Sequence, residues 1–113
     1  MKLSEIIEKL DLDVKTGAEH LDAEVTRGYV SDMLSDVMGN ASEGSLWITL
    51  QKHHNIVAVA VMKSLSGIVL VKGREPDEDT VAKAEKEGIP ILATPMGAFE
   101  IAGKLSNLGI AGD

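Results

Sequence analysis

The chain has 113 residues, a length that suits a single domain. It contains no cysteine, which excludes disulfides, thiolate metal sites, iron–sulfur ligation and a cysteine nucleophile. Its net charge is −7 and its few cations are scattered, so we expect it to bind neither nucleic acid nor an anionic membrane.

The first residues form an amphipathic segment that carries charges throughout and lacks the apolar core of a signal peptide. The longest apolar run, IVAVAVM, is far shorter than the about 20 residues needed to span a bilayer. We therefore expect a cytoplasmic protein.

The first predicted elements are a helix and a short strand. Residues 3–10 favour a helix with Ser4 as its N-cap and one apolar face. Residues 12–17 predict a short strand that ends at Gly17, and residues 18–24 form a polar connection.

Residues 25–30 predict a second strand, which runs into a helix over residues 31–40. Ser31 or Asp32 is the predicted N-cap, and Gly39 and Asn40 are expected to end the helix in the left-handed conformation. The expected buried stripe of this helix is Met33, Leu34, Val37 and Met38.

The second half contains a repeated pattern in which a glycine precedes a mostly apolar run. These runs start at Gly44, Gly67 and Gly88, about 22 residues apart, which leaves room for one strand, one helix and two turns. Continuous apolar strands indicate a sheet covered on both faces. We expect three parallel strands joined by right-handed crossovers, with Gly67 and Gly88 also ending the preceding helices.

Two of the connecting helices are clear in the sequence. Residues 76–88 begin with acids, continue with lysines, and turn Val81 and Ala84 inward. For residues 96–109 we expect Thr94 as the cap and Pro95 at the opening. The expected apolar stripe of that helix is Phe99, Ala102, Leu105 and Leu108.

Residues 54–65 are ambiguous between a helix and a strand. Their alternation of valine with alanine favours a strand, reached by a hairpin through residues 51–55. We favour a buried helix, because only a helix of ~12 residues returns the chain to begin the next strand in parallel. The predicted fold class is α/β, a single domain with a mostly parallel sheet and helices packed on it.

Ligands of open parallel sheets usually bind at the carboxyl ends of the strands, beside helix N-termini. The residues at the three predicted ends are Thr49, Gln51, His53, His54 and Asn55, then Lys72, Gly73, Arg74 and Glu75, and last Thr94, Pro95, Met96 and Gly97. If the strands are neighbours, these residues form one rim that suits a small anion. The structural alternative is that they are ordinary caps and solvated turns.

The sequence lacks the catalytic and nucleotide-binding motifs that carry a specific mechanism. It has no phosphate-binding GxxxxGK[ST], no dinucleotide GxGxxG after a strand, no HExxH and no GxSxG. Adjacent histidines such as His53 and His54 point apart on a strand or helix, so we expect no metal site and no cofactor. We expect Trp47 and the methionines Met33, Met38 and Met62 to fill the core.

Three stretches of the sequence resemble a DRTGG domain: GYVSDMLSDVM, WITLQ…NIVAVA and GREPDEDTVAKAEKEGIPIL. The resemblance covers about residues 22–109, a DRTGG core that follows an N-terminal helix and short strand over residues 1–21. It implies a fold like the N-terminal domain of HPr kinase/phosphorylase. DRTGG domains also occur in some CBS-domain pyrophosphatases and long phosphotransacetylases as regulatory or dimerising modules. Short stand-alone members are similar to proteins encoded beside iron hydrogenase components.

The signature region of this family falls on VTRG, where Arg27 stands at a position at which we expect another glycine. A side chain there limits the approach of a ligand to the backbone. Together with the rim, the expected ligand-binding residues are Thr26, Arg27, Gly28, Tyr29, Ser31, Asp32, Thr49, Gln51, His53, Asn55, Gly73, Arg74 and Thr94.

Three functions follow from these patterns. The first is a non-catalytic homodimeric regulatory module that senses a small anionic metabolite or nucleotide, with the TRGYVSD segment as a dimer face or pocket wall. The second is an accessory or assembly subunit of an iron-hydrogenase-type redox complex. The third is an enzyme that acts on a phosphorylated metabolite through Arg74 and His53.

Overall fold

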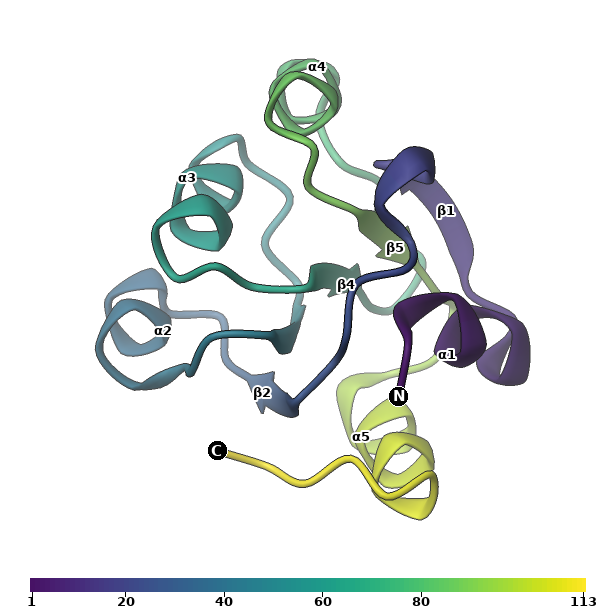
Figure 1. The fold of residues 1–113 in the computed structure, drawn as a ribbon. Coiled ribbons are helices and arrows are strands. Elements are labelled where there is room, and N and C mark those ends of the chain that lie inside the picture. Colours follow the sequence, from purple (N-terminus) through teal and green to yellow (C-terminus); the bar gives the residue numbers. More distant parts are fainter.

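The computed structural model describes residues 1–113 as one α/β domain (Figure 1). The elements in chain order are α1 (Leu3–Leu10), β1 (Asp13–Thr16), the 3₁₀ turn η1 (Ala18–His20), β2 (Arg27–Val30), α2 (Leu34–Asn40), β3 (Ser45–Thr49), α3 (Asn55–Met62), β4 (Gly67–Leu70), α4 (Glu78–Glu87), β5 (Ile91–Ala93) and α5 (Ala98–Asn107). No helix is both long enough and apolar enough to cross a membrane.

The five strands form one sheet in the order β1-β5-β4-β3-β2. Strands β3, β4 and β5 are parallel, as expected for the second half of the chain. Strand β2 is also parallel to β3, and β1 is antiparallel to β5 at one edge. Helices α2, α3 and α4 cover one face of the sheet, while α1 and α5 cover the other (Figure 1). Both faces are therefore dry, which explains the continuous apolar strands.

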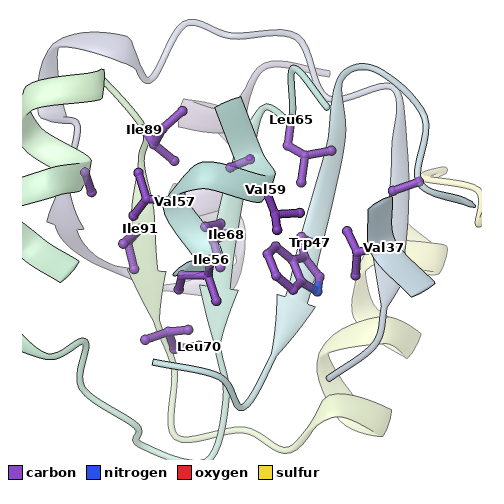
Figure 2. Close-up of a cluster of buried hydrophobic side chains, with 13 residues drawn as sticks. Val37, Trp47, Ile56, Val57, Val59, Leu65, Ile68, Leu70, Ile89 and Ile91 are labelled. Carbon is purple, nitrogen blue, oxygen red and sulfur yellow. The ribbon is translucent and has the colours of Figure 1, made fainter. Parts of the chain in front are cut away.

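The core consists of one apolar cluster on each face of the sheet. Along β3, Trp47 points toward α2 and α3, whereas Leu46 and Ile48 point toward α1 and α5. Figure 2 shows side chains of α3, among them Ile56 and Val59, over the strands that carry Trp47 and Ile68. Trp47 is fully buried, so its predicted place in the core is confirmed.

Residues 55–62 form a helix, so the predicted helix is confirmed and the strand alternative is wrong. Ile56, Val57, Val59 and Ala60 are all buried. Valine costs a few tenths of a kcal/mol in a helix relative to alanine, whereas burial of its side chain gains roughly 1.5 kcal/mol or more. Packing therefore overrides the strand propensity of this segment.

Three predicted helix caps are wrong. Ser4 lies inside α1, whose N-cap is Lys2. Helix α2 starts later than predicted, with Met33 rather than Ser31 or Asp32 at its N-cap. Helix α1 therefore begins before the predicted cap, whereas α2 begins after it, because the chain stays extended for longer after β2 than the sequence indicated.

The third wrong cap is Thr94, because Gly97 is the N-cap of α5. The hydroxyl of Thr94 accepts instead from the amide of Met96 at 3.2 Å, in the turn before the helix.

Two predicted helix ends differ from the structure. Gly39 and Asn40 are helical, and α2 ends at Ala41, which is extended. Gly67 belongs to β4, and the left-handed turn after α3 uses Ser64 at φ 53°. Only Gly88 ends its helix as predicted, at φ 70°.

Three apolar residues predicted to be buried lie on the surface. Met33, Met62 and Phe99 are 63%, 68% and 95% exposed. The buried residues of α5 are instead Ile101 and Leu105. Phe99 lies two residues before Ile101 and therefore on the opposite side of the helix.

Candidate functional site

The loops after β3, β4 and β5 meet at the carboxyl edge of the sheet, because these strands are neighbours. The amide of Gly73 donates to the carbonyl oxygen of Thr94 at 2.9 Å, and the amide of Lys72 donates to that of Met96 at 2.8 Å. The carbonyl oxygen of Lys52 accepts from the Thr80 hydroxyl at 2.8 Å. The predicted rim is therefore a continuous structure in which each loop is bonded to the next.

One half of this rim is a hollow of about 300 Å³ beside β1 and β5. It is lined by Asp11, Asp13 and Glu75 together with Gly73, Ala93, Thr94 and Pro95. The ammonium of Lys15 lies 3.0 Å from Glu75 and 3.5 Å from Asp13. The hydrogen bond to Glu75 raises the pKa of Lys15, although burial opposes the shift. The hollow is acidic and accepts hydrogen-bond donors better than anions.

The other half of the rim, at the start of α3, carries cations and histidines. The rings of His53 and His54 lie 4.4 Å apart between centroids, and Asn55 opens the helix. Arg74 is exposed in the neighbouring loop. The amides of Ile56 and Val57 at the helix start already donate to the carbonyl oxygens of His53 and His54, at 3.2 and 3.1 Å. The group that an approaching anion would meet is therefore the exposed guanidinium of Arg74.

Tyr29, a predicted site residue, hydrogen-bonds to Asp36 of α2 rather than facing a cavity. The Tyr29 hydroxyl donates to the Asp36 carboxylate at 2.8 Å, and the Asn40 side chain donates to the same carboxylate at 3.0 Å. The Ser31 hydroxyl and then Tyr29 lower the pKa of Asp36. The hydrogen bond to Asp36 is in turn the largest cause that raises the pKa of Tyr29. This network ties β2 to α2.

Asp32 ties the loop before α2 to the end of β3. Its carboxylate accepts from the Thr49 hydroxyl at 2.9 Å and from the Leu50 amide at 2.7 Å. Its carbonyl oxygen accepts from the Gln51 side chain at 2.9 Å. Asp32, Thr49 and Gln51, three predicted site residues, therefore form hydrogen bonds among themselves.

Thr26, Arg27 and Gly28 lie far from the rim along β2. The amide of Thr26 donates to Gly44, which precedes β3, and its hydroxyl donates to the carbonyl oxygen of Glu43 at 2.8 Å. Thr26 thus marks the amino edge of the sheet, opposite the edge that carries Arg74. The predicted residues form no single site but separate into a rim, an internal network and a strand edge.

A family model described as the DRTGG domain matches residues 5–108. The chain belongs to the DRTGG domain family. The match begins within α1, so it takes in most of the segment that precedes the core expected from sequence.

The fold of this DRTGG domain is also found in a solved structure, the CBS and DRTGG domains of the regulatory region of Clostridium perfringens pyrophosphatase complexed with activator, diadenosine tetraphosphate. The TM-score is 0.71 and the sequence identity 20%, over 90% of this chain and 44% of that chain. This chain therefore spans less than half of that regulatory region, and the likeness concerns the fold. A search of curated proteins finds no match.

Sequence reasoning placed Glu75 at the rim but missed the other two acidic residues of the hollow in this DRTGG domain. Asp11 and Asp13 reach the rim because β1 lies antiparallel beside β5. Strand β1 has four residues, and its partner follows it by more than 70 residues in the chain. No local pattern indicates such a pairing. Only the polar, exposed character of these two acids could have indicated a surface role.

Proposed function

We propose that this DRTGG domain is a non-catalytic regulatory module that responds to a small anionic ligand such as a nucleotide. The observation that carries the proposal is the rim, where two chemically different halves lie side by side at the carboxyl edge of the sheet. Family membership supports it, since the solved relative with this fold belongs to a regulatory region and was complexed with a nucleotide activator.

The two halves of the rim suggest how such a ligand would lie. Its phosphate would meet Arg74 and His53, where hydrogen bonds from a charged donor to an anion are charge-assisted. Amino groups on its base would donate to the carboxylates of Asp13 and Glu75 in the hollow. Gly73 lines the hollow directly before Arg74 and connects the two subsites.

A thermal-shift screen with nucleotides and central metabolites tests the proposal. A ligand at 100 times its dissociation constant adds about 2.7 kcal/mol of stability, which is easily measured in a small domain. We expect Arg74→Ala to weaken binding at least tenfold. The matched control is Lys86→Ala, which removes an exposed cation in the last turn of α4. A flat screen, or equal affinity in both variants, would contradict the proposal.

We also propose that the module forms a homodimer through the surface around the end of β2. Val30 and Met33 are 51% and 63% exposed there, although both are large apolar side chains. Exposed apolar side chains of this size favour association with another protein surface. Size-exclusion chromatography with light scattering should give a dimer that Met33→Glu dissociates. A wild-type monomer at tens of micromolar would exclude the dimer.

A further inference from the structure

The last residues of the chain lie along the outer edge of β2. After α5 the chain turns at Gly109, at φ 95°, and residues 110–113, here named the tail, run beside β2 (Figure 1). The amide of Gly28 donates to the carbonyl oxygen of Ala111 at 2.9 Å, and Gly28 and Gly112 form a parallel bridge. Since β2 is the last strand of the sheet, the tail takes the position of a further strand.

Polar groups hold the far end of the tail. The Ser45 hydroxyl donates to the Asp113 carboxylate at 2.8 Å, the Ser42 amide donates to it at 3.2 Å, and the Ser42 hydroxyl donates to it as well. The guanidinium of Arg27 lies 3.5 Å from the carbonyl oxygen of Gly112. Burial opposes ionisation of Asp113, but these hydroxyls and the charge of Arg27 keep its pKa below the ordinary value.

The near end of the tail lies over an apolar groove. A cavity of about 210 Å³ is lined by Val30, Ile48 and Leu105, and Ile110 of the tail lines it as well. A Cβ built on Gly28 would lie 3.7 Å from a methyl group of Ile110. This is an ordinary van der Waals distance, so Ile110 lies directly over Gly28 and would fit there even beside a small side chain.

The tail is bound in a way that allows it to leave. Ala111, Gly112 and Asp113 are all exposed, and Ile110 is only half-buried. Exposed hydrogen bonds with few apolar contacts belong to the least stable part of a domain.

We propose that the outer edge of β2 is a docking site for an extended segment of a partner protein, and that the tail occupies this site in the unbound molecule. The segment that fits has an apolar residue, two small residues and an acidic residue in succession. Such a segment would reproduce the contacts of Ile110, the backbone pairing at Gly28 and the hydrogen bonds of Asp113. It would add a strand to the sheet, a common mode of peptide recognition.

A partner segment can gain contacts that the tail does not make. In a parallel ladder, amides of alternate residues point to the same side, so the amide of Val30 faces outward like that of Gly28. The Val30 side chain is 51% exposed, and no strand pairs with β2 on the side away from β3. A partner segment that pairs with both Gly28 and Val30 gains a backbone hydrogen bond beyond the one that the tail accepts from Gly28, which offsets the advantage of a tail attached to the same chain.

The test uses the 113-residue chain and a synthetic peptide with the sequence of residues 108–113. The Asp113→Ala variant loosens the tail, and Asp79→Ala removes an exposed acid of α4 as the matched control. Backbone amide signals of Gly28 and Val30, followed by NMR, report occupancy of the edge. Circular dichroism checks that each variant is folded.

We expect the Gly28 amide to exchange with solvent at least tenfold faster in Asp113→Ala than in Asp79→Ala. The peptide should bind Asp113→Ala at least tenfold more tightly than the wild-type chain, and a peptide with alanine in place of its acid should lose this binding. Arg27→Ala should give the same exchange effect at smaller size. Equal binding to all variants, or no binding to Asp113→Ala, would overturn the proposal. In the Met33→Glu variant, in which the proposed dimer is absent, a Gly28 amide shift that still depends on protein concentration without peptide would overturn it in favour of tail exchange between two copies.

Discussion

Gly17 should be the least replaceable glycine of the domain. It follows β1 at φ 72°, a conformation that L side chains rarely adopt. An added Cβ would lie 2.7 Å from both Cα and N of Pro90 and 2.9 Å from the carbonyl carbon of Ile89. These neighbours are backbone atoms before β5, so they cannot rotate away, and Gly17→Ala must shift β1 relative to β5.

The cost of Gly17→Ala has two parts. The left-handed conformation costs a residue with a Cβ about 1–2 kcal/mol, and overpacking typically costs about 1–3 kcal/mol. We expect Gly17→Ala to lower the free energy of unfolding by about 2–5 kcal/mol, a large share of the roughly 5–15 kcal/mol that a domain has.

Variants at two other glycines separate the cost of the backbone conformation from the cost of overpacking. Gly73 has φ 70° but no atom within 4 Å of an added Cβ, so Gly73→Ala should cost only the backbone part, about 1–2 kcal/mol. Gly28 has an ordinary φ and only the 3.7 Å contact with Ile110, so Gly28→Ala should be neutral or gain up to about 1 kcal/mol. Urea unfolding gives all three values. If Gly17→Ala costs no more than Gly73→Ala, the contact between β1 and Pro90 is not as close as described.

Other variants test the internal network. Asp32→Ala removes the acceptor for the Leu50 amide and should lower the free energy of unfolding by about 1–2 kcal/mol in urea titrations, a value reduced by solvent exposure; no loss would mean that water replaces the carboxylate fully. Because the pKa of Asp36 lies below its ordinary 3.8 in the folded state, its contribution is present above that pH and is lost as pH falls through the folded value. Unfolding curves of Asp36→Asn should therefore depend less on pH in that acidic range than those of the wild type. The pKa of Tyr29 is raised in the folded state, so its contribution to stability is present below pH 10.0 and is lost as pH rises above that value. Unfolding curves of Tyr29→Phe should lack this loss of stability at high pH.

The parallel half of the sheet could be predicted because the information is local. Glycine starts and apolar runs at about 22-residue intervals favour parallel strands joined by helices. The helix at residues 55–62 followed from connectivity rather than propensity, and the structure confirms it. The antiparallel pairing of β1 with β5 has no such signal, since it joins Asp13 to Ala93 across the whole chain.

Caps were predicted less well because a short polar side chain before a helix has other partners. Asp32 lies near the start of α2, but its carboxylate accepts from Thr49 and Leu50. Thr94 likewise bonds to the turn at Met96. The sequence indicates that such residues accept a backbone N–H but does not identify which one.

The candidate site was predicted in part. The geometry that brings Gly73, Arg74, Glu75 and Thr94 to one edge follows from strand order, whereas Asp11 and Asp13 reach the hollow only through the placement of β1. Ligand binding at the rim stays a prediction, as do the accessory role in a redox complex and the enzymatic use of Arg74 and His53.

Trp47 gives the domain a built-in spectroscopic reporter. It is the one tryptophan of the chain, it is fully buried, and its indole N–H donates to the carbonyl oxygen of Ser31 at 2.8 Å. Its fluorescence therefore reports both the integrity of the core and the position of the loop that joins β2 to α2. The chain has only one tyrosine besides, so Trp47 dominates the intrinsic fluorescence. Unfolding, ligand addition and association can therefore be followed without an attached dye.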